Sequence, residues 1–541
     1  MKRIISILLA AMLLISVAAC SREGNDVPVS DTTPAPSAKP PEMAEPPATA
    51  EPPATAEPEP TLSPEEGIEL LSVMIASESA AEWTGYVPLC QAVWSVIALG
   101  EESAQRYPEL TKVLERNNAA SRKYGEEFVG ENIAWAQELA AENEYFYGLT
   151  WKDECIIQRA DEHILSIRGD WSAYSGGVHP NYGVYGMNLD PESGEDVPLT
   201  DILTETDGLA DILANKLLEK YPDVYLESLP EMLADYELEN YSWTLNYQGL
   251  TFYFSPYEIA SYAAGLLTVT IWFDEAPELF CEEYMATPEQ GYAVALPLAY
   301  PVEFDLDETD GKRDEITVSY MLVDGTGLLQ PIIGKNSTQL EEPESFAYEF
   351  MPYLVHLDGK SYLYLEGVVE NDYKTISIYD LNGDEIYLAG RIDGSGFNRS
   401  LYENGEYGGY YADLFNDPEN FKLSTRLHVL GTMSGVQTCR VNPDYGMPEA
   451  VTDYYDLSGN PRLLVSKLPL EVEMLSEGTR EELSAGTEFR MLRTDGETYM
   501  DMALEDGREC RITLSRDDDT WSWLINGVSE WDCFEDLFYA G

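Results

Sequence analysis

The chain has 541 residues, which is more than one hydrophobic core usually contains, so we expect two to four domains. Hydrophobic residues make up 44% and aromatic residues 11%, including 36 tyrosines, a composition that excludes a wholly disordered or collagen-like chain. Acidic residues outnumber basic residues by 98 to 32, for a net charge of −66, which argues against binding to nucleic acid and against adsorption to anionic lipid through a basic surface.

The first 20 residues resemble a bacterial lipoprotein signal peptide. Lys2 and Arg3 precede an apolar run at residues 4–18 that is too short to span a bilayer. The run ends in Val-Ala-Ala-Cys, which resembles the lipobox where a peptidase cuts before the cysteine and a diacylglycerol is attached to its sulfur. The resemblance implies that Cys20 carries the only membrane anchor. The alternative is a plain signal peptide with a chance cysteine.

Residues 21–63 predict a disordered tether. They are rich in Pro, Ala, Thr and Glu, and the hexapeptide Glu-Pro-Pro-Ala-Thr-Ala occurs twice, at residues 45–50 and 51–56. Proline lacks a backbone donor and fixes φ, so such a segment extends and cannot pack a core. At about 3.1 Å per residue it would reach roughly 130 Å. We therefore expect the protein on the outer face of the cell membrane of a Gram-positive bacterium, exposed to the cell wall.

Residues 64–284 predict an α+β domain. Ser63-Pro64-Glu65-Glu66 matches a helix start, with serine as N-cap and proline at the first position, so we expect a helix through the apolar run 68–76. Apolar residues at helical spacing predict further helix from Pro108 to Leu139. The rest of the domain mixes both kinds of element. Strands are expected at residues 155–159, 163–168, 184–189, 243–247, 250–254 and 267–272, and helices at 199–203 and 209–221.

Three phrases of this domain resemble one known family. They are Tyr-Ser-Gly-Gly-Val-His-Pro-Asn at residues 174–181, Leu-Thr-Asp-Ile-Leu at 199–203, and Leu-Thr-Phe-Tyr-Phe-Ser-Pro-Tyr-Glu-Ile-Ala-Ser-Tyr-Ala-Ala-Gly at 250–265. In this order they resemble the RsiV-like extracellular domain, which is shared by the lysozyme-sensing anti-sigma factor RsiV and the non-catalytic part of the deacetylase PdaC, and which occurs in Firmicutes lipoproteins. The resemblance implies an α+β binding module on the wall side of the membrane.

Residues 285–468 predict an all-β region. Related phrases contain Asp305, Asp380 and Asp456, which are 75 and 76 residues apart. Two blades of about 38 residues would fill each interval, which is close to the repeat of a β-propeller. The same phrases also fit the turn chemistry of unrelated hairpins. A propeller-like fold and another all-β arrangement are therefore both open.

Residues 469–541 predict a small domain of their own. Asp-Gly turns at residues 495–496 and 506–507 separate short strands, a spacing that indicates an SH3-like barrel. Cys510 and Cys533 are the one plausible disulfide pair, and we expect most of the cysteines after Cys20 to be buried thiols. Aromatic residues gather near the end of the chain, and we expect them to form a core and packing seam rather than a ligand face. They are Trp521, Trp523, Trp531, Phe534, Phe538 and Tyr539.

The glycine-rich loop of the first phrase is the candidate partner-binding site. Gly176 and Gly177 can take positive φ and bring backbone donors close to a partner. Tyr174, His179 and Tyr182 would supply rigid, amphipathic contact area. The alternative is that the glycines form a tight loop and the aromatic side chains close the core beneath it.

An acidic segment between predicted strands at residues 302–304 and 316–322 is the candidate metal site. Carboxylates near a glycine suit a hard, oxygen-seeking cation, so calcium is the possible cofactor. One residue more than in the usual calcium loop separates two of the carboxylates, and a solvated acidic turn is the alternative. The candidate ligands are Asp305, Asp307, Asp310 and Asp314.

The sequence contains no recognisable catalytic motif, since its four histidines lie apart without metal-ligand or nucleophile spacing. We therefore expect a non-enzymatic, lipid-anchored extracytoplasmic protein whose RsiV-like domain binds a cationic protein such as a lysozyme, or a cell-wall glycan. Strong negative charge would speed the encounter with a basic partner. Two alternatives stay open: a cell-wall-modifying hydrolase that uses scattered carboxylates, and a structural or assembly lipoprotein of the cell surface.

Overall fold

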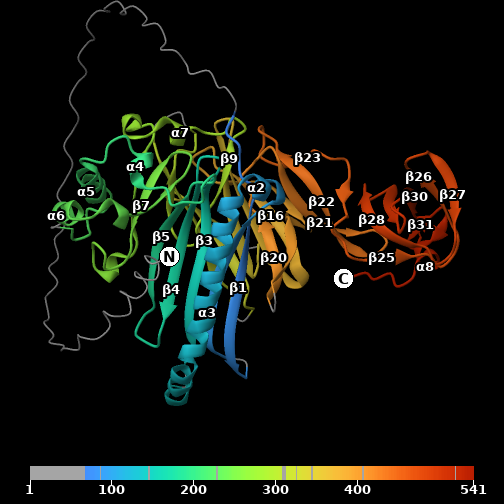
Figure 1. The fold of residues 1–541 in the computed structure, drawn as a ribbon, viewed down its shortest axis with the longest axis horizontal. Coiled ribbons are helices and arrows are strands. Elements are labelled where there is room, and N and C mark those ends of the chain that lie inside the picture. The colour runs from blue at the N-terminus through green and yellow to red at the C-terminus, as the bar shows by residue number, and fades with distance from the viewer. Residues whose placement is uncertain are drawn as a thin grey trace, which may run out of the picture. The chain divides into compact units, whose positions relative to one another are not determined.

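The described part of the chain forms five β-sheets, one long helix and a set of short helices (Figure 1). The computed structural model describes residues 67–540, except residues 86, 144–145, 227–228, 308–311, 324–325, 343–344, 405–406 and 518. All of these belong to Pro64–Gly541, one of the two compact units of the chain. The predicted signal peptide with Cys20 and the predicted tether lie outside the described residues.

The first sheet has seven strands in the order β19-β20-β1-β2-β3-β4-β5. β1 (Val73–Thr84) and β2 (Val87–Leu99) form a long antiparallel hairpin, and β2 pairs with β3 (Leu149–Ala160) in parallel. β4 (Leu165–Tyr174) and β5 (Asn181–Leu189) continue the sheet antiparallel, as the sequence predicts. The candidate binding loop is therefore the turn of the β4–β5 hairpin.

The helix expected through residues 68–76 is wrong, because β1 begins at Val73. β1 pairs with β2 along its whole length, and this cross-strand pairing outweighs a local helix-start signal. The helix expected from Pro108 is confirmed and continues without a break as α3 (Pro108–Glu142), after the short α2 (Glu101–Arg106). None of the helices in the described part of the chain is long and apolar enough to cross a membrane.

α3 lies along one face of this sheet, over β1, β2 and β3 (Figure 1). A buried carboxylate, that of Glu78 on β1, connects the two layers. It accepts a hydrogen bond from Trp94 Nε1 on β2 at 2.9 Å and one from Arg122 Nη2 on α3 at 2.5 Å. A buried carboxylate without such a partner would be strongly destabilising, so this triad holds α3 in register on the sheet.

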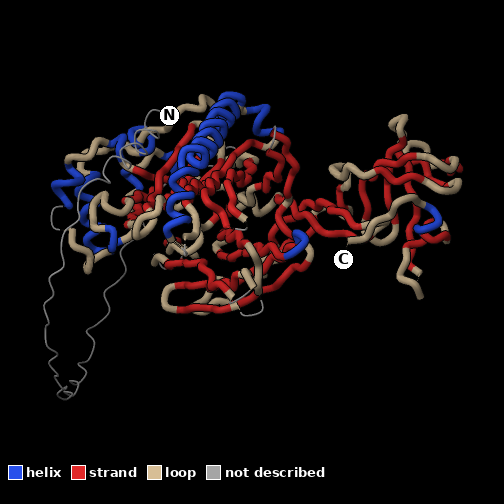
Figure 2. The backbone as a smooth tube through the Cα atoms, turned by 90° about the horizontal axis from the view of Figure 1, so that it is seen from below, coloured by secondary structure: helices blue, strands red, loops and turns tan. Residues whose placement is uncertain are grey.

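Residues 199–285 contain most of the short helices, while strands dominate the rest of the chain (Figure 2). The expected strands and helices of this region are confirmed, and their apolar side chains share one core. The strands β6, β7 and β8 form a three-stranded antiparallel sheet. The elements are α4 (Leu199–Ile202), α5 (Leu209–Lys220), α6 (Leu229–Ala234), β6 (Ser242–Leu245), β7 (Gly249–Phe254), β8 (Leu267–Trp272) and α7 (Glu282–Met285).

The small sheet meets the large one where β6 crosses β5. At Gly186 the two backbones are so close that a Cβ atom would lie 1.7 Å from the carbonyl oxygen of Trp243. Asn188 Nδ2 donates to the same oxygen at 2.8 Å, and Ser166 Oγ donates to Asn188 Oδ1 at 2.6 Å. The Leu245 amide in turn donates to Ser166 Oγ at 2.9 Å. This buried polar chain fixes β6 against β4 and β5.

Residues 285–468 form strands, as expected, but not repeated propeller blades. A four-stranded and a five-stranded sheet lie beside a sheet of thirteen strands. The four-stranded sheet contains β10 (Val302–Phe304), β11 (Asp314–Leu322), β12 (Leu329–Lys335) and β13 (Thr338–Glu341). The five-stranded sheet contains β9 (Tyr292–Ala295), β14 (Glu349–Leu357), β15 (Lys360–Val369), β16 (Tyr373–Asp380) and β17 (Tyr387–Asp393).

The recurring aspartate phrases lie in three different sheets. Asp305 follows β10, Asp380 ends β16, and Asp456 ends the two-residue β24. Asp380 Oδ1 accepts the backbone N–H of Asn382 at 2.8 Å, and Asp456 Oδ1 accepts that of Ser458 at 2.7 Å. The similarity is thus the chemistry of an aspartate that closes a turn after a strand, not the repeat of a blade.

Strand pairing crosses the two domain boundaries expected from the sequence, after residue 284 and after residue 468. β20 (Tyr407–Asp413), paired with β19 (Arg399–Asn404), hydrogen-bonds to β1, so residues beyond 400 extend the sheet of the first region. β25 (Leu463–Val465) pairs with β28 (Glu488–Thr494) across residue 468. The described regions therefore interlock through shared sheets.

The C-terminal strands belong to the open thirteen-stranded sheet, and among the described strands no SH3-like barrel closes. β28 pairs with β24 and β25 on one side and with β29 on the other, so neither of its edges is free to close a small barrel. The other members of this sheet, with α8 (Glu530–Cys533) beside them, are β18 (Ser395–Phe397), β21 (Phe421–His428), β22 (Thr432–Val441), β23 (Pro448–Ala450), β24 (Tyr455–Asp456), β26 (Leu470–Met474), β27 (Thr479–Leu483), β29 (Tyr499–Leu504), β30 (Glu509–Arg516), β31 (Trp523–Ile525) and β32 (Val528–Ser529).

Cys510 and Cys533, the one plausible disulfide pair, are free thiols, as are the other four cysteines of the described residues. Both side chains are fully buried in the C-terminal core. Burial raises the pKa of each thiol to about 11, so neither forms a thiolate readily at neutral pH. They behave as small apolar core residues.

The crossing of β5 and β6 predicts that Gly186→Ala is strongly destabilising. The added Cβ would collide with backbone rather than with a movable side chain, so we expect the free energy of unfolding to fall by about 2 kcal/mol or more. Gly130→Ala is the matched control, because Gly130 is an exposed residue of α3 with no atom within 4 Å of its added Cβ. That variant should gain about 0.5–1 kcal/mol from helix propensity. Urea denaturation of both variants measures the difference, and equal stabilities would contradict the close approach.

Candidate functional site

Aromatic side chains from two separate segments gather beside the β4–β5 turn. His179 comes from this turn, Tyr182 from the start of β5, and Tyr257 and Tyr262 from the segment after β7. We call these four residues the aromatic cluster. Both segments belong to phrases that suggested the family resemblance, so the fold brings together residues about 80 positions apart.

Tyr262 is the centre of the aromatic cluster. Its ring stacks on His179 with centroids 3.9 Å apart and an interplanar angle of 26°. The ring of Tyr182 meets it edge-on at 5.7 Å, and that of Tyr257 lies 5.5 Å away. The Tyr262 hydroxyl donates to the carbonyl oxygen of Pro180 at 2.8 Å, which ties the two segments together. Tyr262 was not among the residues predicted for the site.

The base of the β4–β5 turn packs against the end of α3. Gly176 has φ +91°, and a Cβ there would lie 2.5 Å from Leu139 Cδ1. Trp135 Nε1 donates to the Ser175 carbonyl oxygen at 3.2 Å. Gly177, in contrast, is not in the left-handed region, so only one of the two glycines meets the expectation of positive φ. Gly176 is needed for the turn itself.

The tip of the turn is exposed. Val178 and His179 face solvent, and Tyr257 is 65% exposed at φ +72°. Tyr182 is half-buried, and burial raises the pKa of its hydroxyl. Tyr174 instead ends β4 opposite Thr150 on β3, and no ring contact joins it to the cluster among the described residues. The structure thus groups His179 and Tyr182 but leaves Tyr174 out.

The segment carrying Tyr257 and Tyr262 is fixed to β5. Glu258 Oε2 accepts the Ser255 amide at 2.7 Å, and burial raises the pKa of this carboxyl. Ser255 Oγ accepts the amide of Val184 on β5 at 3.1 Å. The side chains of Glu258 and Ser255 therefore hold this segment in place. The cluster presents aromatic faces together with polar edges.

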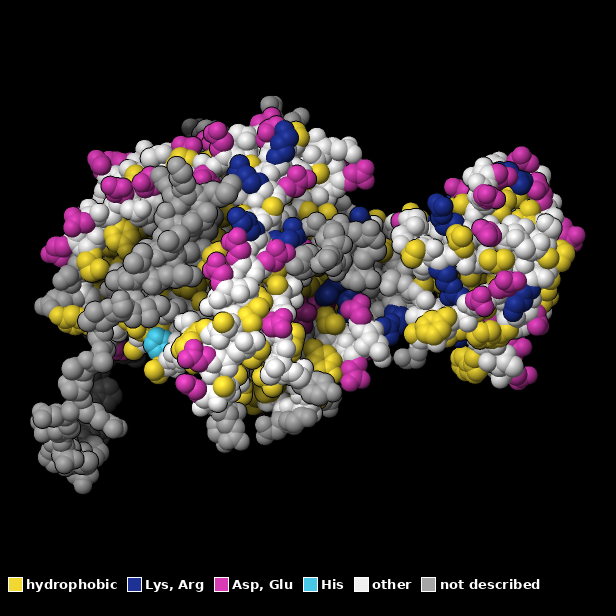
Figure 3. Space-filling model, turned by 60° about the horizontal axis from the view of Figure 1, so that its bottom comes forward, with side chains coloured by type: hydrophobic (Ala, Val, Ile, Leu, Met, Phe, Trp, Pro, Cys, Tyr) yellow, Lys and Arg dark blue, Asp and Glu magenta, His cyan; other side chains and the backbone are white. Residues whose placement is uncertain are grey.

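Acidic side chains are dispersed over the face shown in Figure 3 rather than gathered into one patch. On this face the negative charge is thus spread out and does not form a single docking site. Such a field attracts cationic molecules from solution and is screened by salt.

The candidate metal ligands are only partly brought together. Asp305 is buried, and its Oδ2 accepts Arg313 Nη1 at 2.5 Å. Asp314 Oδ1 accepts Asn336 Nδ2 at 2.6 Å. Asp310 lies outside the described residues. Within the described ranges, no group of three or more His, Cys, Asp or Glu side chains is placed to hold a metal ion.

Arg313 is therefore the cation next to Asp305. It also pairs with Asp274, and its guanidinium carbon lies 4.5 Å from the centroid of the Trp272 ring. The calcium interpretation stays a prediction that depends on Asp310. Melting temperatures with and without millimolar calcium test it, because an ion that binds only the folded state raises them.

A histidine–serine pair on β14 and β15 has the composition of a nucleophile and base. His356 Nδ1 and Ser361 Oγ are hydrogen-bonded at 3.0 Å. However, Ser361 is fully buried, and its hydroxyl donates to the Leu306 carbonyl oxygen at 2.8 Å. A nucleophile must reach its substrate, so this pair is a structural connection between the two strands and the Leu306 turn.

On strands β3, β4 and β5, the half-buried side chains of Asp153 and Tyr185 lie near the Asp170–Arg168 ion pair. The Tyr185 hydroxyl on β5 donates to Asp153 Oδ1 on β3 at 2.9 Å. Burial raises the pKa of Asp153 from 3.8 to about 6, although this hydrogen bond lowers it. The charge of Asp170 raises it further, and Asp170 itself pairs with Arg168 Nε at 2.8 Å.

This site predicts a pH dependence for Asp153→Asn. Between pH 3.8 and about 6 the folded protein keeps a proton on Asp153 that the unfolded chain has released. The contribution of Asp153 to the free energy of unfolding therefore falls as the pH rises through that window. We expect the variant and the wild type to melt at similar temperatures near pH 4 and the variant to melt higher at pH 7. Thermal unfolding of both proteins across this range measures the difference. A variant that loses stability relative to the wild type as the pH rises would contradict the raised pKa.

Comparisons with known proteins place a family match on part of this region. Residues 200–274 match the family model described as "Protein of unknown function (DUF3298)", and no curated protein matches the chain. A solved DUF3298 family member from Bacteroides fragilis is similar to 40% of the chain over 95% of its own length, at 20% identity and a TM-score of 0.29. A DUF3298 family protein from Pseudomonas aeruginosa is similar to 40% of the chain over 97% of its own length, at 15% identity and a TM-score of 0.28. Tyr257 and Tyr262 lie inside the matched residues, and the chain carries a DUF3298 domain at residues 200–274.

Proposed function

We propose that this chain is a lipid-anchored extracytoplasmic binding protein whose RsiV-like domain engages a cationic protein of the lysozyme type, or a cell-wall glycan, through the aromatic cluster. The observation that carries the proposal is the exposed turn tip with His179 stacked on Tyr262. Tyrosine supplies large contact area at low entropic cost, and tyrosine-rich patches are common binding hot spots.

The rigidity of the cluster supports this function. Stacking and the Tyr262–Pro180 hydrogen bond order the rings before a partner arrives, so little conformational entropy remains to be lost on binding. A purely structural role would not require Val178, Tyr257 and His179 to face solvent. The acidic chain would also raise the rate of encounter with a basic partner.

The location rests on the sequence alone. The lipobox-like ending at Cys20 supports an anchor on the outer face of the membrane, with residues 21–63 as a spacer through the wall. A single lipid-bearing cysteine provides the two acyl chains that stable attachment needs. Fractionation of cells carrying Cys20→Ala tests this part separately, because the variant should leave the membrane fraction or stay unprocessed.

Partner capture tests the aromatic cluster. With the chain from Ser21 onward, we expect binding to a lysozyme or to purified peptidoglycan, and the combined change His179→Ala and Tyr257→Ala should weaken it at least tenfold, about 1.4 kcal/mol. Both side chains are exposed, so the melting temperature should stay within the range of ordinary surface substitutions. Lysozyme binding should also weaken as salt is raised.

Tyr320→Ala is the matched control, because Tyr320 on β11 is 47% exposed and outside the cluster. It should bind like the wild type. A folded double variant that captures either partner at full strength would exclude the cluster as the contact surface. If the wild-type chain binds neither lysozyme nor peptidoglycan, the proposed function is excluded.

A further inference from the structure

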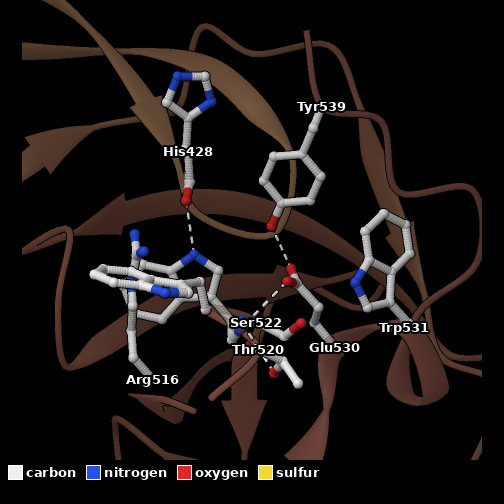
Figure 4. A pocket seen from close by; sticks show the side chains of 9 residues that line it. His428, Arg516, Thr520, Ser522, Glu530, Trp531 and Tyr539 are labelled. Atoms are coloured by element: carbon white, nitrogen blue, oxygen red, sulfur yellow. Dashed lines mark hydrogen bonds between the residues drawn. The ribbon is translucent and has the colours of Figure 1, made fainter. Parts of the chain in front are cut away.

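A cavity of about 340 Å³ opens near the C-terminus, remote in sequence from the DUF3298 domain (Figure 4). Four segments line it: the end of β21, the loop between β30 and β31, the helix α8, and the last residues of the chain. Its volume lies at the lower end of the range of small-molecule sites, roughly 300–1,000 Å³. It therefore has room for a compact ligand.

Two tryptophans at this cavity are exposed, contrary to the expectation that the C-terminal aromatic residues form a core. Trp523 and Phe534 are buried as expected, but Trp521 is 74% exposed and Trp531 is 48% exposed. Trp521 also has φ +60°, a backbone conformation that costs about 1–2 kcal/mol for a residue with a side chain. Neither burial nor turn preference accounts for a tryptophan at this position.

The loop that carries Trp521 is well organised. The Trp521 amide donates to the Asp517 carbonyl oxygen at 2.9 Å, and Asp517 Oδ1 accepts the amides of Asp519 and Thr520 at 2.9 Å each. These hydrogen bonds fix the backbone that carries the exposed Trp521 ring at the edge of the cavity.

A buried carboxylate faces the cavity from α8. Glu530 Oε1 accepts the Trp523 amide at 3.0 Å, and Oε2 accepts the hydroxyl of Tyr539. Because a carboxylate has four lone-pair directions, these two hydrogen bonds leave acceptor capacity toward the cavity. Both bonds also fix the Glu530 side chain, and the one to the Tyr539 hydroxyl is seen in Figure 4.

Donors lie across the cavity from Trp531. Arg516 stacks over the Trp523 ring with its guanidinium carbon 4.3 Å from the ring centroid, and Arg516 and Trp531 lie on opposite sides of Glu530 (Figure 4). His428 lines the cavity with its backbone, because its imidazole points away from Glu530 (Figure 4) and its Nδ1 pairs with Thr432 Oγ1 at 2.9 Å. The lining thus combines aromatic faces, the cationic donor Arg516 and the fixed acceptor Glu530.

We propose that this cavity binds one or two sugar rings of a saccharide. A pyranose ring has an apolar face that packs on an aromatic ring and hydroxyl groups that both donate and accept hydrogen bonds. Trp521 and Trp531 offer the aromatic faces, Glu530 accepts, and Arg516 donates. An aliphatic ligand would leave these polar groups unpaired, and a quaternary ammonium ion would meet the positive charge of Arg516.

This site lies in another part of the chain from the aromatic cluster, so it does not depend on the proposed function. The test uses the chain from Ser21 onward and trimers of glucose, of N-acetylglucosamine and of mannose as probes. Titration calorimetry, with tryptophan fluorescence as a second readout, should detect at least one trimer with a dissociation constant of about 1 mM or tighter.

Trp521→Ala should weaken that binding at least tenfold, about 1.4 kcal/mol, with an unchanged melting temperature because the ring is exposed. Trp83→Ala is the matched control, since Trp83 is 53% exposed on β1, away from the cavity, and should bind like the wild type. Absence of binding by all three trimers at about 10 mM would overturn the proposal. So would equal loss in both variants, or tetramethylammonium binding that depends on Trp521 in place of saccharide binding.

Discussion

The crossing of β5 and β6 at Gly186 positions the candidate site. β5 begins at the binding turn, and β7, the hairpin partner of β6, leads into the segment with Tyr257 and Tyr262. Only a glycine lets the Trp243 carbonyl come so close to β5, and the same carbonyl accepts the buried Asn188 amide. Because the backbones of β5 and β6 are in contact, the two strands cannot shift along each other, and the two aromatic segments meet in one arrangement. The stacking within the aromatic cluster is a consequence of that crossing.

The described regions cannot be treated as independent modules. β20 pairs with β1, the Asn416 side chain donates to the Leu71 carbonyl oxygen at 2.9 Å, and Gln248 bonds with the backbone of Asp305 in both directions. Because these contacts join segments far apart in sequence, the DUF3298 domain at residues 200–274 is supported by strands on both sides of it. Its aromatic cluster therefore depends on the integrity of the larger unit and not only on its own residues.

The excess of acidic residues imposes a second constraint, because buried carboxylates need cations in a chain that has few. Arginine meets this need at several places, and its planar donor groups suit carboxylates better than lysine does. Arg493 and Arg511 both donate to the fully buried Asp501. Because these arginines pair with buried carboxylates, they do not neutralise the acidic side chains of the surface, and an acidic surface favours encounters with cationic partners. Further buried carboxylates with an arginine partner are found in the pairs Glu78–Arg122, Asp161–Arg159, Asp305–Arg313 and Glu366–Arg399.

Local patterns in the sequence determined most elements, including β8 at residues 267–272 and the helix from Pro108, because periodicity and turn residues act within a few positions. They also placed His179 on an exposed turn and Tyr182 directly after it. They could not determine β1, whose strand depends on its partners, or the open C-terminal sheet, where β28 pairs with strands on both sides. Nor could they identify Tyr262 as the centre of the cluster or separate exposed Trp521 from buried Trp523. Such contacts join residues far apart in the chain, and only the tertiary structure decides which of them meet.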